Sequence, residues 1–417
     1  MTGLSEHDRR AYEANIWKTY AFQFLYSFQL WWPIWVLYLT DFRGFSLTQV
    51  SGLEALFWMV IVLSEVPTGA VADRFGRKTS LLLGAACTTV AVLVFGVASS
   101  YWIVLASYVA WAFGLTFMSG ADAALVFESL RAVGREQDYP RVAGIGWGIF
   151  SFGTLAGMLA GAPLAAATDL RFPVLISATI AFLTLLVAAT YREPPLVEGE
   201  ERLTYRRLII ESGRTAWRLP SVRTMLLLSA LLMGATNAAS IFAQPFLDHH
   251  DVPVHLFGFA QAPMRVAGII GAVAAYRIVA GFGLRPTLIV APVIMAASYA
   301  LLGGWNSVYA FGATTAIIFT SSLLLPVVSD YVNRRIPNNQ RATILSFRQL
   351  LASLVIASFQ PGLGVIADQV SLAAVFIASA AFIAVTVPAA LFFWLVADAR
   401  EKEAGAGLVE AEAVAGS

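Results

Sequence analysis

The sequence predicts an all-α integral membrane protein with twelve spans, and three observations support this. Of its 417 residues, 58% are hydrophobic and only 13% are charged, which excludes an ordinary soluble domain. Apolar stretches of roughly 20 residues recur along the chain, the length that a helix needs to cross about 30 Å of hydrocarbon. No stretch alternates apolar and polar residues in the short segments typical of outer-membrane barrel strands. Helices are therefore the expected spanning elements.

The predicted spans form two groups of six around the longest polar stretch of the chain. They are expected near 16–39, 47–71, 79–98, 101–126, 142–167, 172–191, 222–244, 255–276, 284–304, 307–331, 343–366 and 371–396. This division predicts a six-helix bundle at 1–191, a cytoplasmic linker at 192–221, a second six-helix bundle at 222–396 and a flexible cytoplasmic tail at 397–417.

Positive charge is unevenly distributed among the predicted loops. The loops after the odd-numbered spans carry only Arg43 and Arg171 as Lys or Arg residues, whereas the alternate loops and both ends are rich in these residues. Since basic loops stay in the cytoplasm, both termini are expected there. The polar first 15 residues lead straight into a span, so no cleavable signal peptide is expected. Cys87 is the single cysteine, which allows no disulfide within the chain.

The first span carries four aromatic residues at spacings that place them on one face of a continuous helix, namely Phe24, Phe28, Trp31 and Trp35. Pro33 predicts a kink within this helix. The tryptophans lie near the expected outer boundary of the membrane, where indole rings commonly form a belt. We therefore interpret the aromatic face as a lipid-facing stripe.

The loop after the second span contains the decapeptide GAVADRFGRK at residues 69–78. Its charges sit at a bilayer boundary, where they are costly unless they pair. The decapeptide resembles the loop signature G-x-L-A-D-R-x-G-R-K of the major facilitator superfamily, with Val71 in the leucine position. The residues that carry this resemblance are Gly69, Asp73, Arg74, Gly76, Arg77 and Lys78.

The resemblance implies the major facilitator fold, two pseudo-symmetric six-helix bundles that rock about a site near the membrane midplane. An internal echo agrees with two related halves, since GAVAD at 69–73 recurs as GAVAA at 271–275, although short runs of small residues also recur by chance. The same offset of 202 residues carries Glu128 to Asp330.

In this family, the loop aspartate lies near the N-terminus of the eleventh helix, and the loop arginine pairs with an acid that ends the fourth helix. Glu128 fits the position of that acid, so the resemblance predicts a gating latch made by Asp73, Arg77 and Glu128. The alternative is a surface loop anchored by basic side chains. The first helix of each bundle lines the cavity in this family, which gives a second interpretation of Phe24, Phe28 and Trp31, as an aromatic wall for the substrate.

Two further acids are predicted inside the membrane. Glu65 lies about 12 Å along the helix from the loop motif, and Asp122 lies about 9 Å before Glu128. A carboxyl group in a low-dielectric site can take up and release a proton near neutral pH. Either acid is thus a candidate for proton coupling, and the alternative for each is a fixed hydrogen-bond anchor.

The fifth span is rich in glycine, which lets helices approach closely. Its spacing resembles a motif of drug–proton antiporters in the superfamily, although the final glycine pair of that motif is missing. The residues that match, expected to serve helix packing, are Gly148, Gly157, Gly161 and Pro163.

The second half offers fewer polar candidates within its spans. Arg265, deep in the eighth span, is expected to pair with an acid across the cavity or to bind an anionic group of the substrate. Asn237 in the seventh span is a candidate neutral contact to the substrate, with helix packing as the alternative. Arg348, near the start of the eleventh span, is expected to reach the membrane interface.

The sequence lacks a phosphate-binding GxxxxGK, a metal-ligand spacing of His and Cys, and a nucleophile elbow. No enzyme activity, cofactor, metal or nucleic-acid partner is therefore expected. Energy must come from a gradient, and membrane acids make protons the first choice. The leading hypothesis is a monomeric transporter in a bacterial inner membrane that exports a small organic or hydrophobic compound in exchange for protons. Alternatives are a symporter or uniporter that imports a metabolite, and a receptor on the same fold.

Overall fold

The computed structural model describes residues 5–194, 218–336 and 341–415. Within these ranges every regular element is helical, and eleven helices are long and apolar enough to cross a membrane. The predicted all-α membrane fold is therefore confirmed. Residues 195–217, most of the predicted linker, lie outside the described part of the chain.

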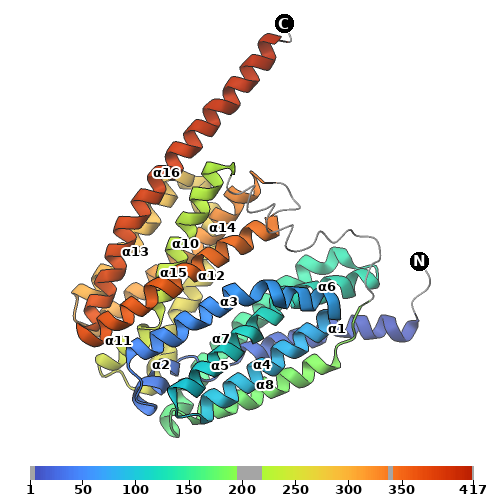
Figure 1. The fold of residues 1–417 in the computed structure, drawn as a ribbon, viewed down its shortest axis with the longest axis vertical. Helices are drawn as coiled ribbons and strands as arrows, with labels where there is room; N and C mark the ends of the chain where they lie inside the picture. Colours follow the sequence, from blue (N-terminus) through green and yellow to red (C-terminus); the bar gives the residue numbers. More distant parts are fainter. Residues whose placement is uncertain (1–4, 195–217, 337–340, 416–417) are drawn as a thin grey trace. The chain divides into compact units, whose positions relative to one another are not determined.

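The chain forms two compact units (Figure 1). The first comprises Met1–Tyr205 together with Gln244–Pro263, and the second comprises Arg206–Ala243 together with Met264–Ser417. The main helices of the first unit are α1 (Glu6–Ser27), α2 (Trp35–Leu37), α3 (Leu47–Phe75), α4 (Arg77–Val97), α5 (Tyr101–Met118), α6 (Ala121–Ala132), α7 (Tyr139–Ala167) and α8 (Phe172–Thr190). The remaining helices are α10 (Pro220–Ser240), α11 (Ala243–His249), α12 (Phe257–Phe282), α13 (Leu284–Gly304), α14 (Ala313–Asn333), α15 (Arg341–Gln369) and α16 (Leu372–Ala415).

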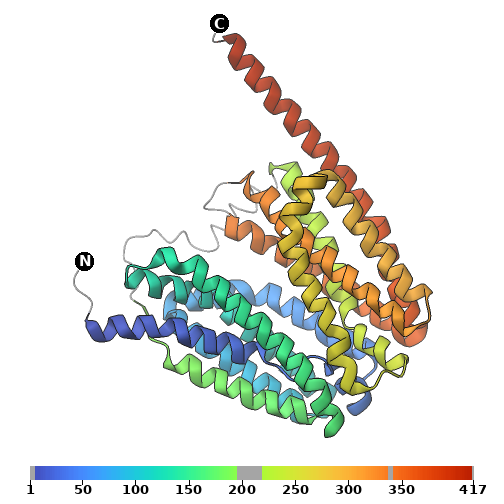
Figure 2. The same ribbon diagram turned by 180° about the vertical axis from the view of Figure 1, so that it is seen from behind.

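Within the first unit, α1 lies beside α7 and α8, as Figure 2 shows, and α4 packs between α5 and α8. Small residues allow these close contacts. Gly84 of α4 and Gly114 of α5 face each other, and a Cβ added at Gly84 would lie 2.9 Å from the carbonyl oxygen of Gly114. Because glycine has no side chain, the backbones of the two helices come close enough to make van der Waals contact.

The first span is broken rather than kinked, so the prediction of one helix over 16–39 is wrong. Helix α1 ends at Ser27, and helical structure resumes as α2 at Trp35. This break explains why the first span is not among the eleven long apolar helices. The predicted aromatic face is disrupted with it, and Trp31 and Trp35 are buried at 7% and 6% exposure instead of facing lipid. Pro33 cannot donate a helical hydrogen bond, which agrees with a helix that stops before it.

Side chains from other helices satisfy the backbone of this break. The amide of Leu30 donates to Ser177 Oγ of α8 at 3.0 Å. Gln244 accepts from the amide of Val36 at 2.8 Å and donates to the carbonyl of Trp32 at 2.9 Å. Gln261 donates to the carbonyl of Pro33 at 3.1 Å. Non-helical backbone inside a membrane protein is tolerated where such partners exist, because lipid offers none.

The segment between α1 and α2 packs against glycines of α7. A Cβ added at Gly157 would lie 2.9 Å from the carbonyl oxygen of Gln29, and one at Gly161 would overlap the backbone of Leu30. Gly148 is different, because it is exposed and no atom lies within 4 Å of its Cβ position. The packing predicted for Gly148 is therefore wrong. Pro163 lies inside α7, near its end at Ala167.

In the second unit, α10 packs against α14, α15 and α16, and α13 lies along α16. Helix α16 continues through the residues that we expected to form a flexible tail, 397–417, as far as Ala415. The first residues of this extension make specific contacts. Glu401 accepts hydrogen bonds from the amide and hydroxyl of Ser221, at the start of α10. These contacts order the beginning of the predicted tail.

Candidate functional site

Gly76 separates α3 from α4 in a conformation that only glycine adopts easily. Its φ is 96° and its ψ is 161°, in a region from which a Cβ excludes other residues. The chain thereby turns sharply enough for α4 to begin at the next residue, Arg77. The loop signature found in the sequence is thus built into two helix ends with one residue between them.

Arg77 connects the ends of α3 and α6. Its guanidinium donates to Asp73 at 2.9 Å and lies 3.5 Å from the carboxylate of Glu128. The exposed fraction is only 18% for Arg77 and 22% for Glu128, so water screens this pair less than an ordinary surface ion pair, which contributes about 0–1 kcal/mol. The structure therefore brings together the three residues that the sequence had grouped. Asp73 has a further interaction besides this one.

Glu193, just after α8, is a member of this cluster that the sequence analysis missed. Its carboxylate accepts hydrogen bonds from the amides of Arg77 at 2.6 Å and Lys78 at 2.7 Å. It therefore caps the N-terminus of α4, where free amides and the helix dipole favour a negative charge. A Cβ at Gly76 would lie 2.6 Å from the same carboxylate. The available signal was an acid directly after the sixth span, on the side of the membrane where the third span begins. The predicted linker at 192–221 includes Glu193.

The start of α1 is tied to the same end of the first unit. Asn15 is fully buried, and its amide donates to Ser129 Oγ at 2.9 Å and to the carbonyl of Arg192 at 2.8 Å. Arg192 also lies 3.3 Å from Asp8. The hydrogen bond from Ser5, together with the charge of Arg192, lowers the pKa of Asp8. These contacts join α1, α6 and α8 next to the cap formed by Glu193.

The remaining residues of the loop motif have peripheral places. Arg74 is exposed, and its guanidinium carbon lies 5.3 Å from the ring centroid of Phe75. The backbone of Lys78 binds Glu193, and its side chain lines a cavity of about 480 Å³ together with Lys18 and Arg192. Gly69 lies within α3, with no atom within 4 Å of its Cβ position. Its role in packing is therefore small in this structure.

The two candidate membrane acids are both half-buried in the first unit. Glu65 lies on α3, next to Ser64, which donates to Thr116 of α5 at 3.2 Å. Among the described residues, none forms an ion pair or hydrogen bond with the side chain of Glu65. Asp122 lies in the first turn of α6 and accepts from the amide of Ala123 at 2.7 Å. Helix α6 begins here because Gly120, with a φ of 74°, ends the continuous run of α5.

The aromatic candidates divide into two groups. Phe24 and Phe28 stack at 5.4 Å, and Phe24 stacks on Phe152 of α7 at 6.3 Å, all three being at least partly exposed. Trp31 instead packs edge-on against Trp111 of α5 at 4.8 Å and is buried. Only the phenylalanines therefore present surface that a molecule next to α1 could contact.

The polar candidates of the second unit lie on three different helices, α12, α10 and α15. Arg265 is exposed on α12, and it takes part in an interaction. Asn237 is exposed on α10, and its amide donates to the carbonyl of Met233 on the same helix at 2.8 Å. Arg348 is buried at 9% exposure and donates to Ser329 of α14 at 3.1 Å. The expectation that Arg348 reaches the membrane interface is therefore wrong, because a hydroxyl inside the unit is its partner.

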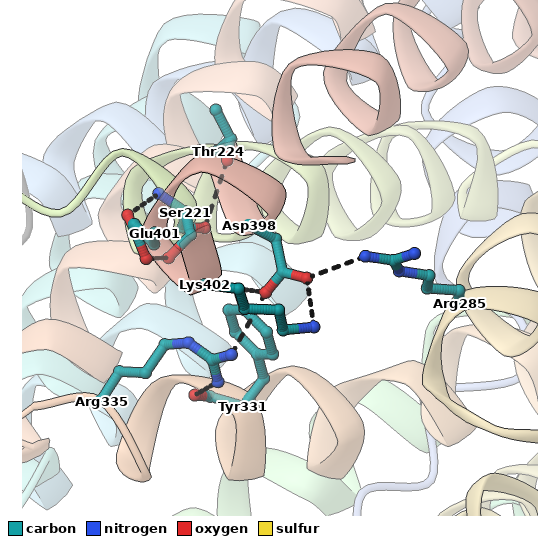
Figure 3. Close-up of polar contacts among 8 residues, drawn as sticks. All are labelled: Ser221, Thr224, Arg285, Tyr331, Arg335, Asp398, Glu401 and Lys402. Atoms are coloured by element: carbon teal, nitrogen blue, oxygen red, sulfur yellow. Dashed lines mark hydrogen bonds and ion pairs between the residues drawn. The ribbon is translucent and has the colours of Figure 1, made fainter. Parts of the chain in front are cut away.

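The second unit has its own charge cluster, where the ends of α10, α13 and α14 meet a middle part of α16 (Figure 3). Asp398 of α16 is 2% exposed and accepts from Lys402 at 2.8 Å, Tyr331 at 2.9 Å, Arg335 at 3.2 Å and Arg285 at 3.4 Å. Arg285 follows Gly283, whose φ of 85° and ψ of 163° nearly repeat those of Gly76. By contrast, Asp330 pairs at the surface with Arg334 of its own helix at 2.9 Å. Asp398 is thus a buried acid of this unit, and its role was not predicted from the sequence.

Comparison with known proteins gives three related findings. The profile of the Major Facilitator Superfamily matches residues 20–282. Two relatives from Bacillus subtilis (strain 168) are described as uncharacterized MFS-type transporters. YceJ is 25% identical over 313 residues, 74% of this chain and 75% of the relative, and YxaM is 20% identical over 370 residues, 85% and 89% of the two chains.

Solved structures resemble the fold closely. A crystal structure of the nucleoside transporter NupG superposes with a TM-score of 0.76 over 92% of this chain and 99% of that one, at 12% identity. A bacterial homolog of the human lysosomal transporter Spinster, inward-facing and unoccupied, superposes with a TM-score of 0.67 over 94% and 98%, at 17% identity. At these identities the likeness concerns the fold.

Proposed function

Since this chain belongs to the Major Facilitator Superfamily, we propose that it is a secondary active transporter that works by alternating access. It exports a small organic or hydrophobic compound in exchange for protons. Its place is the inner membrane of a bacterium, with both termini in the cytoplasm, and it works as a monomer.

The observation that carries this proposal is the pairing of Arg77 with both Asp73 and Glu128. One guanidinium joins two helix ends through a short and a longer contact, which is an arrangement that can open and reform. The cap that Glu193 places on α4 fixes the backbone of Arg77, so movement is left to side chains and helix ends. We propose that this cluster is the gating latch of the transport cycle.

Proton coupling is assigned to Glu65 and Asp122. A charged carboxylate costs about 2.5–3.5 kcal/mol at the centre of a membrane helix, so a half-buried acid without a basic partner gains from protonation. Such a group can take a proton on one side and lose it on the other. Phe24 and Phe28 are the proposed apolar contacts of the compound in the first unit. Asn237 and Arg265 are the proposed polar contacts in the second unit, each considered within its own unit.

The test uses inverted membrane vesicles that contain the full chain and hold an acidic interior. Addition of ethidium, a fluorescent organic probe, is expected to make the interior more alkaline as the probe enters and protons leave. Asp73→Asn and Arg77→Ala should abolish this signal while the amount of protein in the membrane stays normal. Full activity in either variant contradicts the latch.

The same vesicles decide between the alternatives. A symporter acidifies the side to which its substrate moves, and a uniporter leaves the pH signal flat while the probe still equilibrates. A receptor on this fold moves no probe at all. Each outcome contradicts proton-coupled export in a distinct way.

A further inference from the structure

Glu54 is a second unpaired acid on α3, and the sequence analysis did not single it out. It lies about 10 Å along the helix from the start at Leu47. The residue is half-buried, and Trp58 stands one turn further along the same face of the helix. Among the described residues, no Lys, Arg or His comes within 4 Å of its carboxylate.

Two aromatic residues follow Glu54 on the same face of α3, since Phe57 and Trp58 stand three and four residues further along. Phe57 contacts Trp58 at 5.7 Å, Tyr108 at 6.3 Å and Trp111 at 6.4 Å between ring centroids. Tyr108 and Trp111 of α5 lie 6.1 Å apart and face α3. The acid thus stands at the edge of a group of rings drawn from two helices.

This group has a buried floor and a partly open rim. Phe95 and Tyr108 are only 1% and 2% exposed, and Trp31 closes the floor against Trp111 at 4.8 Å. Phe57, Trp58 and Trp111 are half-buried, as is Glu54. The rim therefore offers three aromatic surfaces and one carboxylate to a molecule that approaches it.

The chemistry of this rim selects one class of ligand. An ionised carboxylate is costly in the membrane unless a positive charge balances it, and no basic side chain in the described part of the chain does so here. Aromatic faces attract cations, and rings around a carboxylate recognise quaternary ammonium and related groups. A small inorganic cation would lose its water without gaining oxygen ligands, because the rim supplies one carboxylate and rings.

We propose that Glu54, Phe57, Trp58 and Trp111 form a recognition site for a hydrophobic organic cation. The physiological role of this site rests on the proposed transport function. The site specifies the substrate class of that transporter, namely hydrophobic organic cations. The cation places its charge next to Glu54 and its apolar groups against the three rings. The carboxylate supplies selectivity for charge, and the rings supply most of the contact area.

The test measures equilibrium binding to the purified full chain in detergent, so it requires no transport. The probe is tetraphenylphosphonium, and triphenylphosphine oxide is the neutral aromatic comparison; calorimetry and quenching of tryptophan fluorescence report binding. We expect the wild type to bind the cation and Glu54→Gln to bind it at least about 10-fold more weakly. Glu136→Gln, the same change at an exposed residue, should bind like the wild type.

Two further variants keep the result interpretable. Glu54→Asp retains the charge and should recover part of the affinity, and Trp58→Phe should weaken binding less than loss of the acid. Thermal unfolding of each variant verifies that the fold is retained. Wild-type affinity in Glu54→Gln overturns the proposal, as does absence of cation binding by the wild type. An equal loss for the neutral compound also overturns it, because the acid then serves packing.

Failure of this inference differs from failure of the proposed function. A protein that binds the cation in a Glu54-dependent way but moves nothing in vesicles retains the recognition site and loses the transport proposal. A protein that exchanges ethidium for protons without charge-dependent binding retains the transport proposal and loses this site.

Discussion

At the scale of single residues, the loop signature works through backbone geometry as much as through charge. Gly76 supplies a turn that other residues resist, and it leaves room for the carboxylate of Glu193 above the start of α4. Arg77 can then reach both Asp73 and Glu128 from a fixed backbone. The glycine and the acid are therefore as much a part of the cluster as its charged side chains.

Gly76→Ala is expected to destabilise the protein for two separable reasons. The strained backbone costs on the order of 1–3 kcal/mol, and the new Cβ displaces Glu193, which removes a cap whose loss costs about 0.5–2 kcal/mol. Gly283→Ala is the matched control, because it has nearly the same φ and ψ but only Pro286 Cδ within 4 Å, at 3.7 Å. Thermal unfolding in detergent should show the larger loss for Gly76→Ala.

A double-mutant comparison isolates the cap. Glu193→Ala should lower stability in the wild type and have little further effect in Gly76→Ala, where the carboxylate is already displaced. Additive losses in the double variant contradict the proposed clash.

At the scale of elements, the break between α1 and α2 organises much of the first unit. Its amides and carbonyls are bound by Ser177, Gln244 and Gln261, and its backbone lies against glycines of α7. Hydrophobicity alone predicts a span here, and it was right about length and location. It was wrong about continuity, because the break depends on hydrogen-bond partners distant in sequence, among them Gln244 and Gln261.

Substitutions in α7 test this packing directly. Gly157→Ala places a Cβ 2.9 Å from the carbonyl oxygen of Gln29, and overpacking of this kind costs about 1–3 kcal/mol. Gly148→Ala, in the same helix with no neighbour within 4 Å, should be neutral or stabilising by up to about 1 kcal/mol, because alanine favours helix. The midpoint of thermal unfolding should fall for the first variant alone. Similar midpoints for the two variants contradict the close approach.

Only part of the candidate site could be predicted from the sequence. Asp73, Arg77 and Glu128 were grouped because charge at a membrane boundary is rare and a family signature surrounds it. Glu193 and Asp398 were missed, since each acts on a helix end far away in the chain. Glu54 was missed because its aromatic neighbours come from two helices, and only the packing of α3 on α5 brings them together.

At the scale of the whole molecule, each unit places a glycine with positive φ between two helices, and a carboxylate from later in the chain lies near the start of the second of these helices. Gly76 and Glu193 do this in the first unit, and Gly283 and Asp398 do it in the second. The two glycines are 207 residues apart, from 283 − 76, whereas the echo in the sequence gave 202. The repeat is thus expressed in geometry more clearly than in residue identity.

Transport by such a molecule requires that protonation change which state is favoured, and Glu65 is the first residue to test. In proteoliposomes, Glu65→Gln should lose accumulation of ethidium driven by a pH gradient yet retain exchange of ethidium across the membrane, because a neutral side chain permits the conformational cycle without carrying a proton. A fixed hydrogen-bond anchor predicts the opposite, since glutamine preserves hydrogen bonding and both activities would persist. Asp122→Asn is measured alongside, and Glu136→Gln serves as the control of identical chemistry at an exposed position. If both membrane acids can be neutralised without loss of gradient-driven accumulation, the proton is carried elsewhere, and Glu54 becomes the next acid to substitute.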